Sequence, residues 1–127
     1  MRFLRIVRSI AAVLIGYLLF AVSTFLLFKF SGQPPHQTAP IEFMATVAIA
    51  GMFFSFLGGY VSGLLAGTKP LGHAIGVAVV LLLGASVSLV STIGKGAIWS
   101  QLIAILLIAP GAVLGGWVRS RHHKNLT

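Results

Sequence analysis

The chain has 127 residues, which is enough for one domain, and carries nine Lys and Arg residues against a single acidic residue. Only 8% of its residues are charged, 57% are hydrophobic, and its mean hydropathy is +1.03. Because a soluble domain carries about 25% charged residues, this composition excludes a water-soluble domain and indicates an exterior that faces lipid. The absence of cysteine excludes disulfides, thiol catalysis and cysteine-based metal sites.

Four stretches contain no Lys, Arg, Asp or Glu, and each is long enough to cross a bilayer as a helix: 9–28, 43–68, 70–94 and 96–118. They are apolar on every side, which favours helices because a helix satisfies its own backbone hydrogen bonds within lipid. We predict an all-α membrane protein, a bundle of four transmembrane helices forming one integral membrane domain. The expected helices cover about 6–30, 41–67, 70–93 and 97–119, and a basic tail follows over 119–127.

The basic residues flank the apolar segments, and their distribution predicts the orientation of the chain. If the N-terminus is inside, two Lys residues face outward and seven basic residues face inward: Arg2, Arg5, Arg8, Lys69, Arg119, Arg121 and Lys124. This bias follows the positive-inside rule, so we expect both termini in the cytoplasm. The same residues are expected to contact anionic lipid headgroups. They form no continuous patch for phosphate contacts, so we expect no binding to nucleic acid.

Small residues recur at helical spacing along three of the segments, where they would let helix backbones approach closely. The second segment is expected to be the most central, because its stripe is the longest. A narrow pathway lined by bare backbone carbonyls is the alternative interpretation. The positions expected to pack are Gly51, Ser55, Gly59, Gly63 and Gly67 in the second segment, Gly72, Gly76 and Gly84 in the third, and Gly111 and Gly115 in the fourth.

Two short motifs resemble each other, Leu57–Val61 near the end of the second segment and Leu114–Val118 near the end of the fourth. Each contains a glycine pair, an aromatic residue and a valine. The pattern fits two repeated helix hairpins, and it fits equally well a shared need for an aromatic residue at the membrane interface.

Few side chains offer chemistry. Glu42 is expected in the first turn of the second helix, where a carboxylate favours the helix dipole; a proton or cation site is the alternative. His73 is expected one turn into the third helix, either packing against a neighbour or titrating near neutral pH. Pro110 should bend the fourth helix and is the candidate for a hinge or a local widening.

Hydroxyl groups make the end of the third segment more polar than its start. Ser86, Ser88, Ser91 and Thr92 lie there, and Ser23 and Thr24 lie in the first segment. Such hydroxyls either bond back to the carbonyl four residues earlier or line a small hydrophilic cavity. No catalytic motif, metal-ligand cluster or cofactor-binding motif appears, so we predict a protein that is not an enzyme and that binds no metal or cofactor.

Two families of this size do not fit, because the first segment lacks the glutamate of small multidrug transporters and the fluoride-channel motif is missing. The chain resembles small four-helix bacterial inner-membrane proteins of uncharacterised activity. The resemblance rests on Gly58-Gly59-Tyr60, His73-Ala74, Trp99, Pro110 and Gly115-Gly116-Trp117 with Arg119. It implies the same architecture and a bacterial inner membrane, and it implies no activity.

Two functions are consistent with these features. The first is a non-enzymatic bundle that acts as a subunit, binds lipids, or associates with a membrane protein or with its own copies. The alternative is a channel or carrier for a small neutral or weakly polar solute. A wide cavity between the second, third and fourth helices would favour transport, whereas a filled centre would favour the bundle.

Overall fold

The computed structural model describes residues 2–32, 40–94 and 98–126. Three helices, α1 (Arg2–Ser31), α2 (Ile41–Ala66) and α3 (Pro70–Thr92), are followed by α4 (Trp99–Ile103), the π-helical turn η1 (Ala104–Ile108) and α5 (Ala109–Leu126). The last three elements form one continuous fourth helix. All four helices are long and apolar enough to span a bilayer. The chain is therefore an integral membrane protein built as a four-helix bundle, as its sequence predicts.

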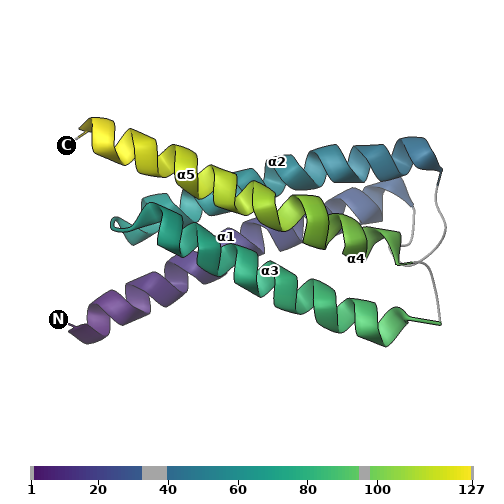
Figure 1. Ribbon diagram of the computed structural model, residues 1–127, viewed down its shortest axis with the longest axis horizontal. Coiled ribbons are helices and arrows are strands. Elements are labelled where there is room, and N and C mark those ends of the chain that lie inside the picture. Colours follow the sequence, from purple (N-terminus) through teal and green to yellow (C-terminus); the bar gives the residue numbers. More distant parts are fainter. Residues whose placement is uncertain (1, 33–39, 95–97, 127) are drawn as a thin grey trace.

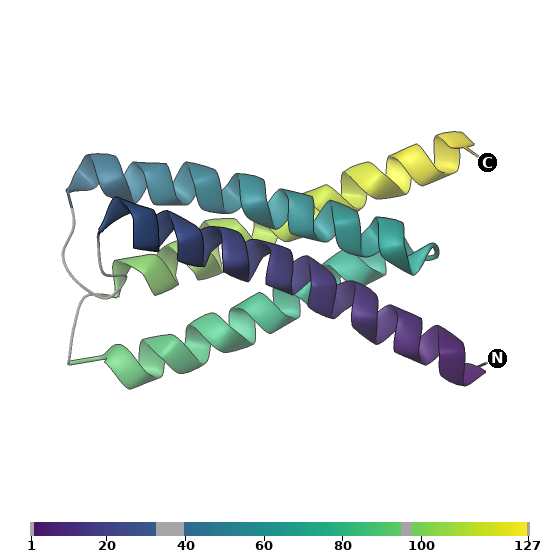
Figure 2. The same ribbon diagram turned by 180° about the vertical axis from the view of Figure 1, so that it is seen from behind.

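Helix α1 begins and α5 finishes at the same end of the bundle, the end at which the chain turns from α2 into α3 (Figures 1 and 2). We call this the terminal end and the opposite one the distal end. Residues 33–39, between the first and second expected helices, lie outside the described residues, as does Lys95, one of the two Lys residues expected to face outward. Six of the predicted inward basic residues belong to segments that meet at the terminal end: Arg2, Arg5, Arg8, Lys69, Arg119 and Arg121.

Helix α2 is the most central, because it contacts α1, α3 and every element of the fourth helix. Glycines make its closest approaches. A Cβ atom on Gly16 of α1 would lie 2.5 Å from the carbonyl oxygen of Gly58, and one on Gly58 would lie equally close to the carbonyl oxygen of Gly16. A Cβ atom on Gly59 would overlap the carbonyl oxygen of Ala112 in α5. The helices therefore touch backbone to backbone, which is how small residues hold membrane helices together.

The two glycine-pair motifs occupy similar places but contact different neighbours. Gly58 faces α1 and Gly59 faces α5, whereas Gly115 faces Phe56 of α2 and Gly116 faces Ala74 of α3. If α1–α2 and α3–α5 were symmetric hairpins, the first glycine of each pair would face its own hairpin partner. In α5 the second glycine of the pair, Gly116, faces the hairpin partner instead. Both motifs therefore pack helices together, but their contacts are not those of two repeated hairpins.

The turn at the terminal end is secured by capping. Gly67 adopts a left-handed conformation with φ of 75° and donates its N–H to the carbonyl of Gly63 at 3.3 Å. Arg8 of α1 donates from Nε to the carbonyl of Leu65 at 2.8 Å. A cation beside the last carbonyls of α2 also complements the helix dipole. Helix α3 then begins with Pro70, whose missing N–H costs nothing in a first turn.

The fourth helix is not a regular α-helix throughout, and it continues further than predicted. One π turn precedes Pro110, where the N–H of Ala109 bonds the carbonyl of Ala104 five residues earlier. This is the local widening expected at the proline, whose ring and missing N–H disturb the α-helical pattern. The predicted tail is also helical, because α5 continues to Leu126. Its extension packs on α2, where the Tyr60 hydroxyl and His122 Nδ1 share a hydrogen bond of 2.9 Å.

Candidate functional site

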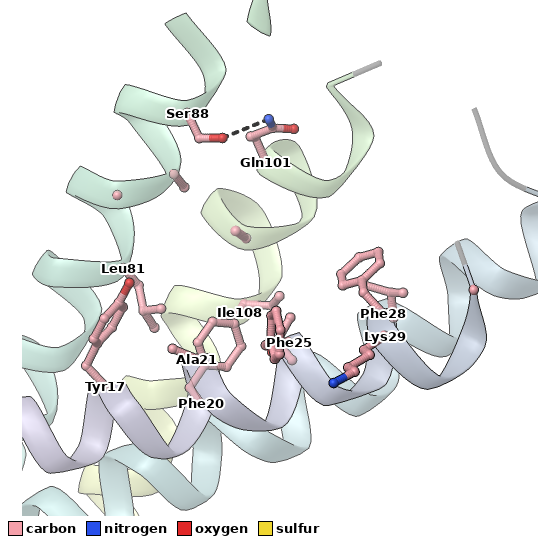
Figure 3. Close-up of a pocket in the computed structure, with 16 residues that line it drawn as sticks. Tyr17, Phe20, Ala21, Phe25, Phe28, Lys29, Leu81, Ser88, Gln101 and Ile108 are labelled. Atoms are coloured by element: carbon pink, nitrogen blue, oxygen red, sulfur yellow. Dashed lines mark hydrogen bonds between the residues drawn. The ribbon is translucent and has the colours of Figure 1, made fainter. Parts of the chain in front are cut away.

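A cleft of about 800 Å³ opens in the distal half of the bundle, between α1 on one side and α3 with the fourth helix on the other (Figure 3). Its lining is mostly apolar. Sixteen residues form its walls: Tyr17, Phe20, Ala21, Thr24, Phe25, Phe28, Lys29, Gly32, Val47, Leu81, Gly84, Ala85, Ser88, Gln101, Ala104 and Ile108. The volume is within the range of sites that bind small molecules, about 300–1,000 Å³.

The cleft exists because α1 and α3 cross part-way along the bundle and diverge from that crossing toward the distal end (Figures 1 and 2). Where they meet, a Cβ atom on Gly76 would lie 3.1 Å from Val13, and one on Gly16 would lie 3.1 Å from Val77. Two turns later, Gly84 of α3 has no atom within 4 Å of its Cβ position. The separation that opens there is the cleft.

The inner end of the cleft is closed by packed side chains. Phe20 of α1 and Leu81 of α3 are 8% and 5% exposed, and they belong to one buried cluster with Val77, Ile108 and Ala112. Below them the glycine contacts of α1, α2 and α5 bring the helix backbones together. The cleft therefore ends near the middle of the bundle, among the described residues, and does not cross it.

The fourth helix forms the back of the cleft through one of its faces. Gln101, Ala104 and Ile108 all line it. Gln101 is only 3% exposed and donates from Nε2 to Ser88 Oγ at 3.0 Å and to Thr92 Oγ1 at 3.3 Å. These bonds join α4 to α3 at the distal end, on the side of the cleft opposite Phe25 and Phe28 (Figure 3).

The rim beside α2 is aromatic. The rings of Phe28, Phe43 and Trp99 have centroids 5.7 to 6.2 Å apart and connect α1, α2 and α4. Edge-to-face contacts at these separations are favourable for aromatic rings. Trp99 thus lies at the distal end, the position expected for an interfacial tryptophan, and the cluster closes the cleft toward α2.

Two polar side chains in α1 stand out against the apolar lining. Lys29 lies exposed at the mouth of the cleft and, among the lining residues that the structure describes, is the one with a charge. Thr24 lies deeper, and its hydroxyl oxygen is buried without a hydrogen-bond partner. By contrast, Ser91 and Thr92 bond back to the carbonyls of Val87 and Ser88, one of the alternatives that the sequence leaves open for hydroxyls. Leaving a buried hydroxyl unpaired is unfavourable.

The titratable residues singled out from the sequence lie outside the cleft and apart from each other. His73 donates from Nδ1 to the carbonyl of Lys69, 2.9 Å away, at the start of α3 near the terminal end. Glu42 is exposed in the first turn of α2, near the distal end. Within the described residues, no group of three or more His, Cys, Asp or Glu could hold a metal ion.

Most of the predicted packing residues lie in helix contacts. Gly51 faces Ile108, Gly111 faces Ser55, and Gly63 faces Pro70. Three positions differ from the prediction. Gly67 lies past the end of α2, against the Arg8 guanidinium, and Gly72 is exposed with only its own turn nearby. Gly84 lines the cleft. None of these three glycines lies between two packed helices, because the rows of small residues in α2 and α3 extend beyond the regions where these helices cross their neighbours.

The open volume does not lie between the second, third and fourth helices, where a cavity would have favoured transport. That region is filled, since Ser55, Gly59 and Ala112 are buried between α2 and α5. The cleft lies instead between α1, α3 and the fourth helix. The sequence did not single out Gln101, and it assigned Lys29, one of the two outward Lys residues, a role in orientation only. The places of these residues at the cleft depend on how far α1 diverges from α3, which the sequence does not reveal.

No protein-family model, curated protein or solved structure matches the chain. The geometry of the cleft and the composition of its walls therefore carry the functional argument.

Proposed function

We propose that the chain is a non-enzymatic, lipid-interacting membrane protein that holds the apolar chain of a membrane lipid in its distal cleft. The observation that carries this proposal is the shape of the cleft. As formed by the described residues, it is mostly apolar, open at the distal end and closed at mid-bundle. From Lys29 to Tyr17 it follows α1 for twelve residues, or about 18 Å at 1.5 Å per residue. One leaflet of the hydrocarbon core is about 15 Å thick.

The depth of the cleft favours a lipid chain over a partner helix. A transmembrane helix needs about 20 residues to cross the core and would lie against a groove that runs the full length of the bundle. This cleft covers only the distal half, because Gly16, Gly76 and Val13 pack α1 against its neighbours below it. A chain that enters from one leaflet fits this half-length space.

The same closure gives the solute-carrier alternative little support. A path for a polar solute needs hydrogen-bonding groups along its length, and the walls here are largely Phe, Ala, Leu, Val and Ile side chains. No second observation favours transport, so the lipid-interacting bundle is the function that the geometry supports best.

We further propose that the terminal end faces the cytoplasm of a bacterial inner membrane. The six basic residues near that end support this orientation through the positive-inside rule. Since the chain has no cysteine, single-cysteine variants can test it. Ser31→Cys at the distal end should react with a membrane-impermeant maleimide on intact cells, and Thr68→Cys at the terminal turn should react only after lysis. The reverse labelling would refute the orientation.

The resemblance of the chain to small four-helix bacterial inner-membrane proteins stays a prediction.

Filling the cleft tests the lipid proposal directly. Gly84→Phe would place a ring in the open space between α1 and α3, whereas Gly72→Phe adds the same ring to an exposed position on the same helix. Native mass spectrometry of protein purified in mild detergent should show one phospholipid retained by the wild type and by Gly72→Phe. Gly84→Phe should lose it.

Equal lipid retention by Gly84→Phe and the wild type would overturn the proposal, as would a wild type that retains no phospholipid. Circular dichroism and size-exclusion profiles of the three proteins establish that each variant is folded, so that a loss of lipid reports on the cleft.

A further inference from the structure

The cleft has chemical features that go beyond a space for an apolar chain. We propose that it selects an anionic ester-linked phospholipid of the distal leaflet, with the phosphate-bearing headgroup at Lys29 and an ester carbonyl accepting a hydrogen bond from Thr24. This inference rests on the proposed lipid-binding function and names the lipid class that the site would take.

The charge at the mouth favours an anionic headgroup. Lys29 is exposed and is the only charged side chain among the described residues of the lining. The single carboxylate of the chain, Glu42, makes no ion pair with Lys29 among the described residues. A Lys side chain at this depth extends its ammonium group toward the membrane surface, where phosphates lie. The positive charge is thus available to a headgroup, and no internal acid neutralises it.

The unpaired hydroxyl of Thr24 supplies a second, independent feature. Its Oγ1 is buried and has no hydrogen-bond partner, although Thr24 lines the cleft. Thr occupies two side-chain rotamers in helices, so a rotation about χ1 can direct the hydroxyl into the cleft. The side chains of Phe20 and Phe28, one turn before and one turn after Thr24, have no polar atom that could pair with its hydroxyl.

The spacing of the two residues matches the anatomy of a phospholipid. Thr24 precedes Lys29 by five residues on α1, which places it about 7.5 Å deeper along the helix. The ester carbonyls of a phospholipid lie a few carbon atoms below its phosphate, and the acyl chains lie below the esters. A lipid whose phosphate is at Lys29 therefore brings a carbonyl to Thr24 and directs an acyl chain toward Tyr17 and Leu81, which line the deep part of the cleft (Figure 3).

Headgroup selectivity tests the role of Lys29. The protein is reconstituted in vesicles containing phosphatidylglycerol and phosphatidylcholine with identical acyl chains, and the lipid retained after extraction is identified by native mass spectrometry. The wild type should prefer phosphatidylglycerol by about fivefold, the effect of one Lys at a membrane surface. Lys29→Gln should remove the preference, and Lys29→Arg should keep it. Lys69→Gln, which removes one charge at the terminal end, is the matched control and should behave as the wild type.

Linkage selectivity tests the role of Thr24. Phosphatidylglycerol with ester-linked chains should outcompete the dialkyl ether form, which has no carbonyl, by about fivefold, as one hydrogen bond allows. Thr24→Val preserves the shape of the side chain and should abolish this difference. Ser23→Ala removes a neighbouring hydroxyl that is not part of the lining and should leave it unchanged.

The outcomes separate this inference from the function on which it rests. If the wild type retains both headgroups equally while Gly84→Phe retains neither, the cleft binds lipid and the headgroup assignment is overturned. If Lys29→Gln keeps the preference, or Thr24→Val keeps the ester selectivity, the corresponding contact is refuted. If Gly84→Phe retains lipid as the wild type does, the binding function itself is refuted.

Discussion

Gly59 of α2 lies directly against the backbone carbonyl of Ala112 in α5, with no room between them for a side chain. The same helix pair repeats this arrangement one turn away, where Gly115 meets the carbonyl of Phe56. Two consecutive backbone contacts fix both the separation and the rotation of α2 and α5. Since α2 contacts every other helix, this crossing sets the frame on which the more open α1–α3 side is built.

Adding one methyl group at this crossing should destabilise the bundle. We expect Gly59→Ala to lower the free energy of unfolding by about 1–3 kcal/mol, because the backbone cannot move away without separating the helices. Gly84→Ala, at a glycine with open space around its Cβ position, is the matched control and should cost nothing. Unfolding by denaturing detergent, followed by circular dichroism, measures both. Equal stability of the two variants would contradict the close crossing.

The sequence predicts the frame of the molecule because the four spans depend on length and hydropathy alone. Glycine spacing also predicts which helices approach closely, and Gly59, Gly111 and Gly115 lie in such contacts. Spacing fails at Gly72 and Gly84, since it describes a face of one helix and contains no information about where the neighbouring helix ends or diverges.

The cleft could not be predicted for a related reason. Phe20, Thr24 and Phe28 share one face of α1 and line the cleft, while Leu14, Leu18 and Val22 lie outside it and are apolar and largely exposed. In a soluble protein a buried face differs in polarity from an exposed one. In lipid both are apolar, so hydropathy cannot distinguish a cleft wall from a lipid-facing surface.

The buried amide of Gln101 should control the width of the cleft at its distal end. We expect Gln101→Leu to weaken the α3–α4 contact by about 0.6–1.7 kcal/mol, the range for hydrogen bonds between membrane helices, and to let the helices separate. An α3 that is no longer held to α4 also changes its distance from α1, and spin labels on cysteines at Phe25 of α1 and Leu83 of α3, both exposed positions, report that distance. The distance distribution should broaden in double electron–electron resonance.

Ser91→Ala is the control for this measurement. The Ser91 hydroxyl bonds the carbonyl of Val87 within its own helix at 2.8 Å, so its loss should leave the distance between α1 and α3 unchanged. An unchanged distribution in Gln101→Leu would show that the Gln101 bonds do not determine the opening.

The helical extension of α5 should depend on the hydrogen bond between Tyr60 and His122. Tyr60→Phe removes the bond of 2.9 Å but keeps the ring, which also faces the Arg119 guanidinium at 5.8 Å. We expect faster amide hydrogen exchange beyond Arg119, with less than about 1 kcal/mol lost from global stability because the bond is exposed. The effects of Tyr60→Phe and His122→Ala should be non-additive, since both remove the same interaction. Additive effects would exclude the bond as the cause.

The π turn η1 should tolerate the loss of one residue. A π turn contains one more residue than an α-helical turn, and Pro110 has no N–H to restore the α-helical bond to Leu106. Deleting Leu106, which is 68% exposed, should convert the turn to α-helix while Gln101 still faces Ser88 and Ala112 still faces Gly59. Deleting Phe53, 58% exposed in the regular helix α2, should instead rotate the preceding part of α2 by about 100°. Gly51 would then turn away from Ile108.

Thermal unfolding measures both deletions. We expect the variant that lacks Leu106 to unfold at a temperature near that of the wild type, and the variant that lacks Phe53 to yield no folded protein. Equal damage from the two deletions would show that η1 holds no extra residue.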